Sequence, residues 1–440
     1  MTKSDGGNMK RFATVLVAAV STVALSGIGQ AVGNEAGAVA SAHHGSQKTT
    51  AKKKWSAYQV KSGVIFNDPR VKKRQGVVLR KDVAAIDHAP KNSHIYAVSW
   101  NFYHAPGILD ALIRAHRRGV SVRFITAREL KHANFGTLKR ALNYRNSRRP
   151  AGMRSFAKTC DHSCRGSGGS MHAKWIAISR SGSSKDVVME GSHNFTGSAA
   201  SNQWNDWYTV VGNQKIFNAY VSVFAEMAKD KKAGPVQVSG QGTGNRIAWF
   251  SPRGGKGDLV MQLLDKVKCG GSKVAGYNGH TMIRIASAVI QGSRGDRIAN
   301  RIRTLNNQGC NIKVIYTMAP NRVLQEMGST PVRHLAFDSN GDGAYDTYLH
   351  MKAMTIVGHL GSNTKAHTVF NGSANWSGMG EVSDEQGMVI NDNPSLEHSY
   401  TTHINTLFGV AVRPRAMNRA LMRRNGITDP YQKIRSQLIG

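Results

Sequence analysis

Hydrophobic and polar positions follow the same succession in two distant parts of the chain. Each part has a segment with the alternation of a β-strand, then an amphipathic helical pattern, then a glycine suited to a left-handed helix cap, then a second apolar strand. In the first part these are residues 95–100, 108–118, Gly119 and 120–126; in the second they are 283–288, 296–308, Gly309 and 311–317. The succession predicts an α/β unit with a largely parallel sheet, present twice.

This repetition divides the chain into two halves. We expect a first α/β domain over residues 61–228 and a second over 246–440, joined by a linker at 229–245 that is rich in Gly, Lys and polar residues. The predicted fold class is α/β, with two duplicated domains whose mixed, mainly parallel sheets are flanked by helices. A pseudo-twofold axis should relate the halves within one chain, so a working monomer is expected.

An export signal is predicted at the start of the chain, over residues 1–42. Lys10 and Arg11 precede an apolar stretch at 12–28, and small residues that suit cleavage follow it. The alternative is an uncleaved membrane anchor, because the apolar stretch is near the lower length limit for spanning a bilayer. A basic arm is expected at 43–60, and the mature protein is predicted to be secreted.

Four cysteines in an exported chain predict two disulfide bonds. Cys160 and Cys164 are close enough in sequence to close a small loop just before the first motif, which leaves Cys269 to pair with Cys310. The alternative is a zinc site that uses Cys160, His162 and Cys164. No second Cys/His pair lies nearby to complete four zinc ligands.

The net charge of the chain is +33. A charge of this size favours polyanionic partners, which include nucleic acid, anionic membranes and cell-wall polymers. It should also steer anionic substrates towards the protein.

Candidate chemistry comes from a motif that occurs twice, H-x-K followed by G-S-x-N-[FW]-[ST]-G. Its histidine, lysine, serine and asparagine are His172, Lys174, Ser192 and Asn194 in the first half and His350, Lys352, Ser373 and Asn375 in the second. Because the motif repeats together with the α/β unit, we expect the two halves to meet at one site. The paired side chains suit a phosphodiester held between two matching half-sites.

These residue types meet the needs of phosphodiester cleavage. The reaction requires a nucleophile, a proton for the leaving alkoxide and positive charge around the phosphoryl oxygens. Imidazole can serve as nucleophile or proton donor near neutral pH, so one histidine attacks phosphorus while the other delivers a proton. The histidine and lysine of H-x-K share one face of a strand, and the asparagine amide and serine hydroxyl add further donors.

The doubled motif resembles the HKD motif of the phospholipase D superfamily, and the chain looks like a secreted bacterial member with two copies. The family motif is H-x-K-x4-D followed by G-S-x-N, and this chain departs from it because Ser179 and Val357 stand at the two aspartate positions. The resemblance implies two phospholipase D-like domains, His172 as the nucleophile, His350 as the general acid and no metal requirement for catalysis.

Separate carboxylates are expected to orient the two histidines. Asp206 and Glu385 lie a short way beyond the asparagine of each motif and are the candidates. A carboxylate on the distal ring nitrogen would fix the tautomer and stabilise the imidazolium. The alternative for each is an ordinary surface acid.

A second pattern lies just before His350. Asp338, Asn340, Asp342 and Asp346 occupy positions 1, 3, 5 and 9 of a calcium-loop pattern, with glycine at position 6. Position 12 is Leu349 rather than Glu, so the EF-hand pattern is incomplete. A structural calcium site is the prediction, and a polar turn with side-chain caps is the alternative.

The resemblance favours a phosphodiesterase (an EC 3.1.4-type hydrolase) that hydrolyses or transfers phospholipid head groups through a phosphohistidine, with a phospholipid or membrane surface as partner. The alternative is an extracellular nuclease that uses the same two histidines, which the charge favours. A third interpretation is a non-enzymatic wall-binding protein with a decayed site. Five aromatic residues are candidates for membrane contact: Trp100, Phe102, Tyr103, Trp204 and Trp207.

Overall fold

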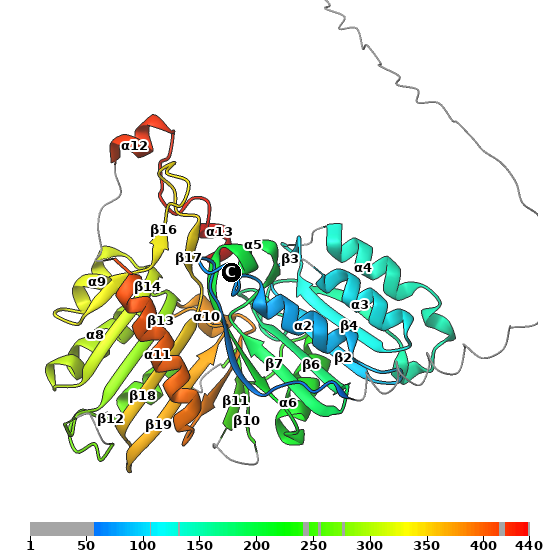
Figure 1. Ribbon diagram of the computed structural model, residues 1–440, viewed down its shortest axis with the longest axis horizontal. Coiled ribbons are helices and arrows are strands. Elements are labelled where there is room, and N and C mark those ends of the chain that lie inside the picture. Colours follow the sequence, from blue (N-terminus) through cyan, green and yellow to red (C-terminus); the bar gives the residue numbers. More distant parts are fainter. Residues whose placement is uncertain are drawn as a thin grey trace, which may run out of the picture. The chain divides into compact units, whose positions relative to one another are not determined.

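The computed structural model describes residues 57–438 except 106, 131–132, 241–245, 254–256, 275–277 and 413–418. The predicted export signal at 1–42 and most of the predicted basic arm at 43–60 lie outside the described residues. Two nine-stranded sheets dominate the described part, and each comes mainly from one half of the chain (Figure 1). Within this part, no helix is long and apolar enough to cross a membrane.

The first sheet has the strand order β16-β17-β9-β7-β6-β2-β4-β5, and β1 pairs with β9. Its strands from the first half are β1 (Gly63–Asn67), β2 (His94–Ser99), β4 (Ser121–Ala127), β5 (Phe156–Cys160), β6 (Lys174–Ser181), β7 (Ser184–Gly191) and β9 (Gln203–Val210). Two short strands from the second half, β16 (Ala336–Phe337) and β17 (Thr347–Leu349), extend it. A separate ribbon pairs β3 (Phe102–Tyr103) with β8 (Phe195–Thr196).

The second sheet has the order β10-β11-β20-β19-β18-β13-β14-β15, and β12 pairs with β18. Its strands are β10 (Val236–Ser239), β11 (Arg246–Phe250), β12 (Val267–Lys268), β13 (Met282–Val289), β14 (Asn311–Met318), β15 (Val332–His334), β18 (Lys352–Leu360), β19 (Asn363–Gly372) and β20 (Gln386–Ile390). The order β1-β9-β7-β6-β2-β4-β5 in the first sheet corresponds to β11-β20-β19-β18-β13-β14-β15 in the second. This correspondence confirms the predicted duplication.

The predicted mainly parallel character of the sheets is wrong. Within the two large sheets, only the β2–β4–β5 and β13–β14–β15 ladders and the β17–β9 pair are parallel. The H-x-K strands β6 and β18 run antiparallel to β2 and β13, and tight hairpins join them to β7 and β19. Strands joined by such a short connection must be antiparallel. Both sheets are therefore mixed α/β sheets, with antiparallel pairs in the majority.

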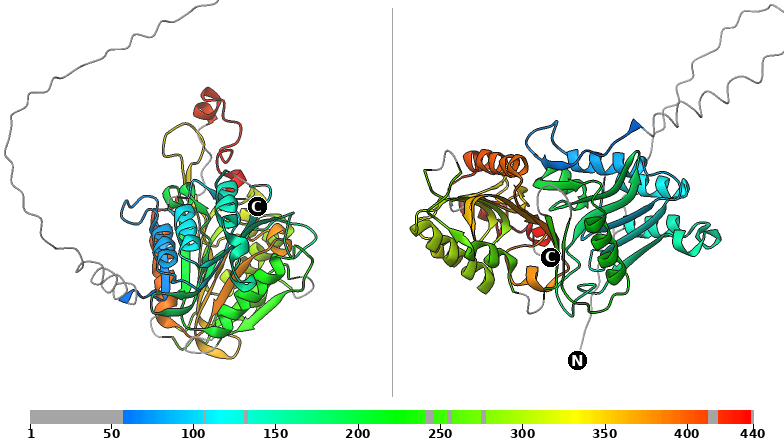
Figure 2. Two further views of the ribbon diagram at one scale, coloured as in Figure 1. Left: turned by 90° about the vertical axis from the view of Figure 1, so that its right-hand side faces the viewer. Right: turned by 90° about the horizontal axis from the view of Figure 1, so that it is seen from below.

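Helices cover both faces of each sheet (Figures 1 and 2). Those of the first half are α2 (Val77–Asp87), α3 (Ile108–Arg117), α4 (Ala133–Asn143), α5 (Gly197–Ser201) and α6 (Gln214–Met227), with 3-10 turns η1 (Asn146–Arg148) and η2 (Ala151–Met153). Those of the second half are α7 (Leu259–Asp265), α8 (Gly292–Asn307), α9 (Asn321–Glu326), α10 (Met379–Val382), α11 (Pro394–Val410), α12 (Arg419–Arg424) and α13 (Arg435–Leu438).

Three large apolar clusters hold these layers together. Helices α2, α3 and α4 pack on the outer face of the first sheet, and α7, α8 and α9 pack on the outer face of the second. The third cluster is shared between the halves, because it contains the apolar sides of α6 and α11 with residues from both sheets. Alternation along β2 explains the division: Ile95 and Ala97 face the outer cluster, whereas Tyr96 and Val98 face the shared one.

The segment predicted as a linker, 229–245, contains strand β10, which pairs with β11, and its last five residues lie outside the described part. Strands β16 and β17 belong to the second half, but they extend the first sheet because β17 pairs with β9. The domain limits at 61–228 and 246–440 remain predictions, since the structure groups residues 51–440 as one compact unit.

Both predicted disulfide pairings are confirmed. Cys160 is bonded to Cys164, and Cys269 is bonded to Cys310. The zinc alternative fails, because the sulfur atoms of Cys160 and Cys164 bond to each other and cannot serve as thiolate ligands.

The two disulfides should differ in their contribution to stability. The Cys269–Cys310 bond closes a loop of sequence separation 41 and the Cys160–Cys164 bond one of only 4. Replacing Cys269 and Cys310 by alanine should lower the free energy of unfolding by about 4 kcal/mol, against about 2 kcal/mol for the shorter loop. Denaturant titration of the two double variants measures this difference, and a larger loss from the shorter loop would contradict it.

Candidate active site

The two H-x-K segments enter the central strands of the two sheets. His172 comes just before β6 and His350 just before β18, and Lys174 and Lys352 are the first residues of those strands. All four side chains are buried. Burial and then the charges of both lysines lower the pKa of each histidine, and the charge of His172 also lowers that of His350. The structure therefore brings the predicted pairs of the two halves to one site.

A close backbone approach explains the glycine of each G-S-x-N segment. Gly191 ends β7 and Gly372 ends β19. A Cβ atom would lie 2.3 Å from the carbonyl oxygen of Asp206 at the first glycine and 2.2 Å from that of Gln386 at the second. Real Cβ atoms do not come this close to a carbonyl oxygen, so only glycine fits. The same contacts show that Asp206 and Gln386 occupy equivalent positions in the two halves.

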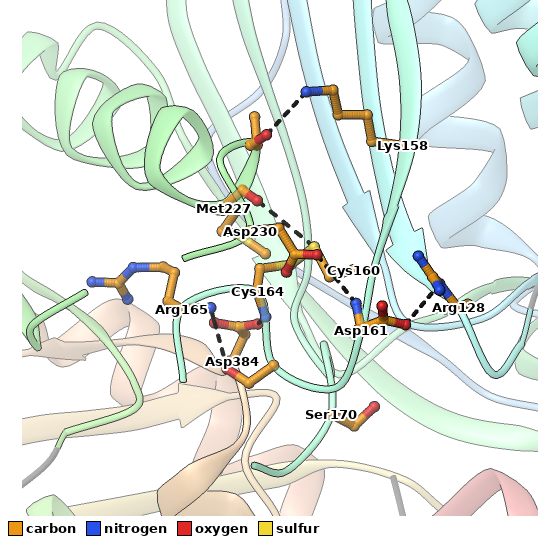
Figure 3. The surroundings of a disulfide bond; sticks show 12 residues. Arg128, Lys158, Cys160, Asp161, Cys164, Arg165, Ser170, Met227, Asp230 and Asp384 are labelled. Carbon is orange, nitrogen blue, oxygen red and sulfur yellow. Dashed lines mark hydrogen bonds and ion pairs between the residues drawn. A yellow bond between two sulfur atoms is a disulfide. The ribbon is translucent and has the colours of Figure 1, made fainter. Parts of the chain in front are cut away.

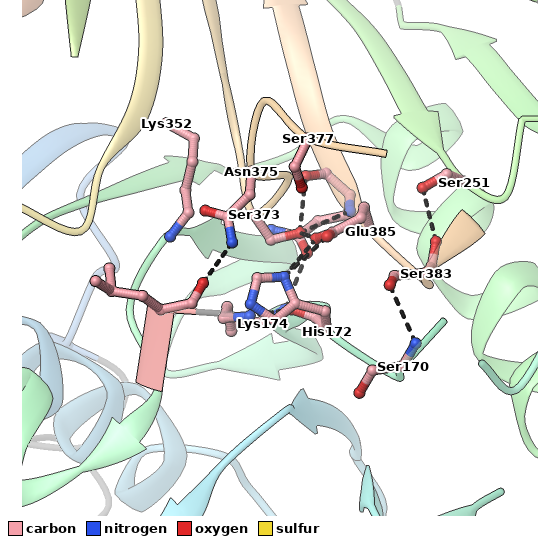
Figure 4. A network of polar contacts seen from close by, with 12 residues as sticks. Ser170, His172, Lys174, Ser251, Lys352, Ser373, Asn375, Ser377, Ser383 and Glu385 are labelled. Atoms are coloured by element: carbon pink, nitrogen blue, oxygen red, sulfur yellow. Dashed lines mark hydrogen bonds and ion pairs between the residues drawn. The ribbon is translucent and has the colours of Figure 1, made fainter. Parts of the chain in front are cut away.

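His172 is oriented by a carboxylate from the opposite half of the chain. Its Nδ1 lies 2.8 Å from Oε1 and 3.0 Å from Oε2 of Glu385 (Figure 4). The hydroxyl of Ser373 donates a hydrogen bond to the same carboxylate. Burial raises the pKa of Glu385 to about 7, although Lys174 and Lys352 act in the other direction. The predicted contact between Glu385 and a histidine is thus present.

His350 is oriented by an amide rather than a carboxylate. Its Nδ1 lies 3.0 Å from Oδ1 of Asn205, which again comes from the opposite half. The prediction that Asp206 holds this histidine is therefore wrong by one position. Asp206 follows Asn205 on β9 and accepts hydrogen bonds from Ser192 Oγ (2.7 Å) and from the hydroxyl of Tyr400 (2.8 Å). Successive side chains of a strand point in opposite directions, so Asn205 reaches His350 and Asp206 does not, although both contact the hydroxyl of Ser192.

Both histidines keep their second ring nitrogen uncommitted. Nε2 of His172 and Nε2 of His350 are buried and have no hydrogen-bond partner among the described residues. Burial, followed by the charges of the two lysines, lowers the pKa of each imidazole well below its usual value. Two imidazoles with fixed Nδ1 atoms therefore present free Nε2 atoms beside two buried lysines.

The lysines are held by the segments that carry the histidines. Nζ of each lysine donates to the carbonyl oxygen of the histidine two residues before it, over 2.7 Å for Lys352. The ring of Trp100 lies 5.3 Å from Nζ of Lys174. Burial lowers the pKa of Lys174 well below its usual value and that of Lys352 to about 7. A bound anion would restore their protons, because it compensates the buried charge.

The asparagines of the two motifs differ in their contacts. Oδ1 of Asn194 accepts a hydrogen bond from the main-chain N–H of Asn101 (3.3 Å). Nδ2 of Asn375 donates to the carbonyl oxygen of Leu438, which brings the C-terminal helix α13 into the site. This carbonyl oxygen occupies the place where Asn375 would donate to a phosphoryl oxygen.

The last turn of the chain closes the site in this structure. Leu438 is fully buried, and Oε1 of Gln437 accepts hydrogen bonds from Ser198 Oγ (3.0 Å) and the Tyr348 hydroxyl (3.2 Å). Behind this segment, His172 is 1 % exposed and His350 is 0 % exposed. We expect access to the two histidines to require a movement of α13, and the deletion described below tests this.

The loop after the first disulfide supports the residue before Glu385 (Figure 3). The carboxylate of Asp384 accepts main-chain N–H groups from Cys164 and from Arg165 (3.2 Å). Arg165 in turn forms an ion pair with Glu226 (2.8 Å) and donates to the carbonyl oxygen of Ser251 (3.1 Å). The disulfide loop thereby anchors the segment that carries Glu385.

The side-chain oxygens of the predicted calcium loop accept hydrogen bonds from main-chain N–H groups of the same loop. Asp338 accepts main-chain N–H groups from Asp342 (3.0 Å) and Gly343, and Asp342 accepts one from Ala344 and forms an ion pair with Lys433. Among the described residues, Asp338, Asp342 and Asp346 do not bring three oxygens within 4.8 Å of one another. Calcium binding by the set that includes Asn340 remains a prediction.

The aromatic residues proposed for membrane contact are mostly core residues. Trp100, Phe102, Trp204 and Trp207 are buried, and Tyr103 alone of the five is exposed. The residues that the sequence did not single out are Asn205, Asp384 and Gln386. Each lies next to a predicted acid, and each adds a contact between the halves or to the disulfide loop.

Two duplicated α/β halves that share one buried pair of H-x-K segments define the class of protein, the phospholipase D superfamily. A family described as "Cardiolipin synthase, PLD-like domain" matches residues 83–228 and 278–408. The chain belongs to this family. No curated protein sequence gives a significant match.

Two solved structures share the fold, and a third gives a shorter match. Polyphosphate kinase from Porphyromonas gingivalis aligns with a TM-score of 0.52 and 15% identity over 79% of this chain, which spans 50% of the kinase. Phosphatidylserine synthase from Haemophilus influenzae Rd KW20 aligns with a TM-score of 0.52 and 11% identity, over 82% of this chain and 90% of the synthase. The phospholipase D family member Nuc from Salmonella typhimurium covers 39% of this chain at 16% identity, with a TM-score of 0.28.

Removing the last turn should expose the histidines. Deletion of residues 437–440 removes the Leu438 carbonyl group and the Gln437 side chain, so diethyl pyrocarbonate should modify His172 at least about tenfold faster than in the full chain. Peptide mass spectrometry measures the rate, with the exposed His398 as internal reference. An unchanged rate at His172 would show that α13 does not control access.

Proposed function

We propose that the chain is an exported phosphodiesterase of phospholipase D type, which hydrolyses phospholipid head groups through a phosphohistidine. One observation carries this proposal. Two imidazoles from opposite halves have their Nδ1 atoms fixed by buried partners and their Nε2 atoms free, and two buried lysines stand beside them. These groups meet the requirements for nucleophilic attack on phosphorus with proton transfer to the leaving group.

The first step uses the Nε2 lone pair of His172 to form a nitrogen–phosphorus bond. The bond from phosphorus to the leaving oxygen breaks, and that oxygen takes the proton from Nε2 of protonated His350. Glu385 suits His172 to the role of nucleophile, because its carboxylate stabilises the positive ring of the phosphohistidine. Negative charge on the substrate favours the protonated form of His350 within the site.

The second step reverses these roles. A water molecule attacks phosphorus, the nitrogen–phosphorus bond breaks, and the proton of the water passes to Nε2 of His350. When an alcohol replaces water, the phosphatidyl group is transferred instead of hydrolysed. Throughout, Lys174 and Lys352 offset the charge on the phosphoryl oxygens, and the amide of Asn375 becomes available once Leu438 has left.

The family description supports the proposed substrate class. The description of the matching family names cardiolipin synthase, an enzyme of phospholipid chemistry, and this favours a lipid phosphodiester. The two disulfides suit an oxidising compartment outside the cytosol, which supports secretion. A phospholipid surface is then the expected partner, and a monomer is the expected active form.

An extracellular nuclease is the second candidate. The observation that favours it is the net charge of +33, since phosphate contacts dominate the affinity of proteins for nucleic acid. The same two-histidine chemistry would cleave DNA or RNA. A wall-binding protein without turnover is the non-enzymatic alternative.

The substrate test compares lipid and DNA under the same conditions. Purified protein without residues 1–42 is incubated with phosphatidylcholine vesicles and separately with plasmid DNA, each with and without EDTA. We expect choline release, no DNA cleavage and no effect of EDTA. DNA cleavage with untouched lipid would support the nuclease instead, and turnover of neither substrate would support the binding protein.

Substitution of the histidines tests the site itself. His172→Ala and His350→Ala should each lower kcat at least about 10³-fold, because each removes a group required in every turnover. His398→Ala is the matched control, since His398 is exposed on α11. Full activity in either site variant would contradict the two-histidine mechanism.

A further inference from the structure

The halves differ at one pair of equivalent positions beside the histidines. Ser192 N donates to the carbonyl oxygen of Asp206 (3.2 Å), and Ser373 N donates to that of Gln386 (2.9 Å). These matched hydrogen bonds make Asp206 equivalent to Gln386. Asn205, the residue before Asp206, is therefore the equivalent of Glu385 in the first half. One half therefore offers a carboxylate to its histidine partner and the other half offers a neutral amide.

The orientation of the Asn205 amide follows from its own contacts. Nδ2 donates to the carbonyl oxygen of Ala199 (3.3 Å) and to Oε1 of Gln203 (3.1 Å), and Asn205 is fully buried. Oδ1 must then face Ser192 Oγ (2.9 Å) and Nδ1 of His350 (3.0 Å). An amide oxygen can only accept a hydrogen bond, so Nδ1 of His350 carries a proton and Nε2 is the nitrogen left for proton transfer.

The surroundings of His350 supply no negative partner. The charged and titratable groups that act on it are Lys352, Lys174, His172 and His193, and all of them disfavour its protonation. The edge of the Tyr348 ring contributes only an aromatic contact, with ring centroids 6.1 Å apart. Among the described residues, no carboxylate hydrogen-bonds His350, since Glu385 binds His172 and Asp206 binds Ser192 and Tyr400.

We propose that Asn205 is the positioning residue of His350 and that its neutrality makes His350 a ready proton donor to the leaving group. The inference rests on the proposed function and adds a determinant of its pH dependence. An amide fixes the same tautomer as a carboxylate but does not stabilise the imidazolium, so the proton on Nε2 is released more readily. The consequence is that leaving-group protonation stops at a lower pH than it would with an acid at position 205.

Asn205→Asp tests this directly in pH–rate profiles. Two substrates share one phosphatidyl group: phosphatidylcholine, whose alkoxide leaves only with a proton, and phosphatidyl-p-nitrophenol, whose phenolate leaves without one. For phosphatidylcholine, the alkaline limb of kcat/KM should move up by about one pH unit or more, because an adjacent opposite charge raises a histidine pKa by this order. The limb for the p-nitrophenyl ester should stay where it is.

Asn205→Ala separates position from charge. Loss of the hydrogen bond frees the ring of His350, so kcat/KM for phosphatidylcholine should fall by about tenfold or more, while kcat/KM for the p-nitrophenyl ester should fall less. Activity on phosphatidylcholine should return in Asn205→Asp, which restores the acceptor. Asn143→Asp is the control for added negative charge, because Asn143 is exposed at the end of α4. Equal losses on both esters, or an unmoved limb in Asn205→Asp, would overturn the inference.

A titration without substrate keeps this inference separate from the proposed function. NMR of histidine-labelled protein, with the His350 signal assigned from His350→Ala, measures its pKa in the wild type and in Asn205→Asp. The aspartate should raise that pKa even if neither ester is hydrolysed, an outcome that would reject only the proposed function. The same pKa in both proteins would reject the role of Asn205.

Discussion

Each reactive histidine takes the partner of its Nδ1 atom from the opposite half of the chain, and the site depends on this exchange. Glu385 crosses to His172 and Asn205 crosses to His350. Neither half alone supplies the Nδ1 partner of its own reactive histidine, so the site requires contact between the two halves. The shared apolar cluster, which includes residues of α6 and α11, holds the two sheets together. The disulfide loop bonded to Asp384 fixes the segment just before β20 that carries Glu385.

Duplication within one chain allows the equivalents to diverge, and here they do so in a regular way. Where one half has an acid, the other has an amide: Glu190 and Asn371, Asp206 and Gln386, Glu385 and Asn205. Nδ2 of Asn371 donates to Glu190 over 2.9 Å, and Nε2 of Gln386 donates to the same carboxyl group over 3.3 Å. Two buried carboxylates facing each other would be costly. Replacing one by an amide keeps the hydrogen bonds and gives the two histidines different electrostatic partners.

Local patterns predicted the elements and the motif residues, because strand alternation and the H-x-K spacing are local. They missed the antiparallel pairing of β6 and β18, since a hydrophobic strand carries no sign of its direction. They selected Asp206 instead of Asn205 because residue type favoured an acid, whereas the choice depends on which face of β9 meets His350. The contact of Leu438 with Asn375 joins residues 63 positions apart, so no local pattern could indicate it.

The central claim is that two halves make one site with one nucleophile. A rapid-quench time course with phosphatidyl-p-nitrophenol in excess over the protein, followed by mass spectrometry of the peptides, measures it most directly. The account predicts a burst of a single equivalent of p-nitrophenol per chain and a phosphatidyl adduct on His172 alone. A burst of two equivalents, or an adduct on His350 in the wild-type protein, would contradict it.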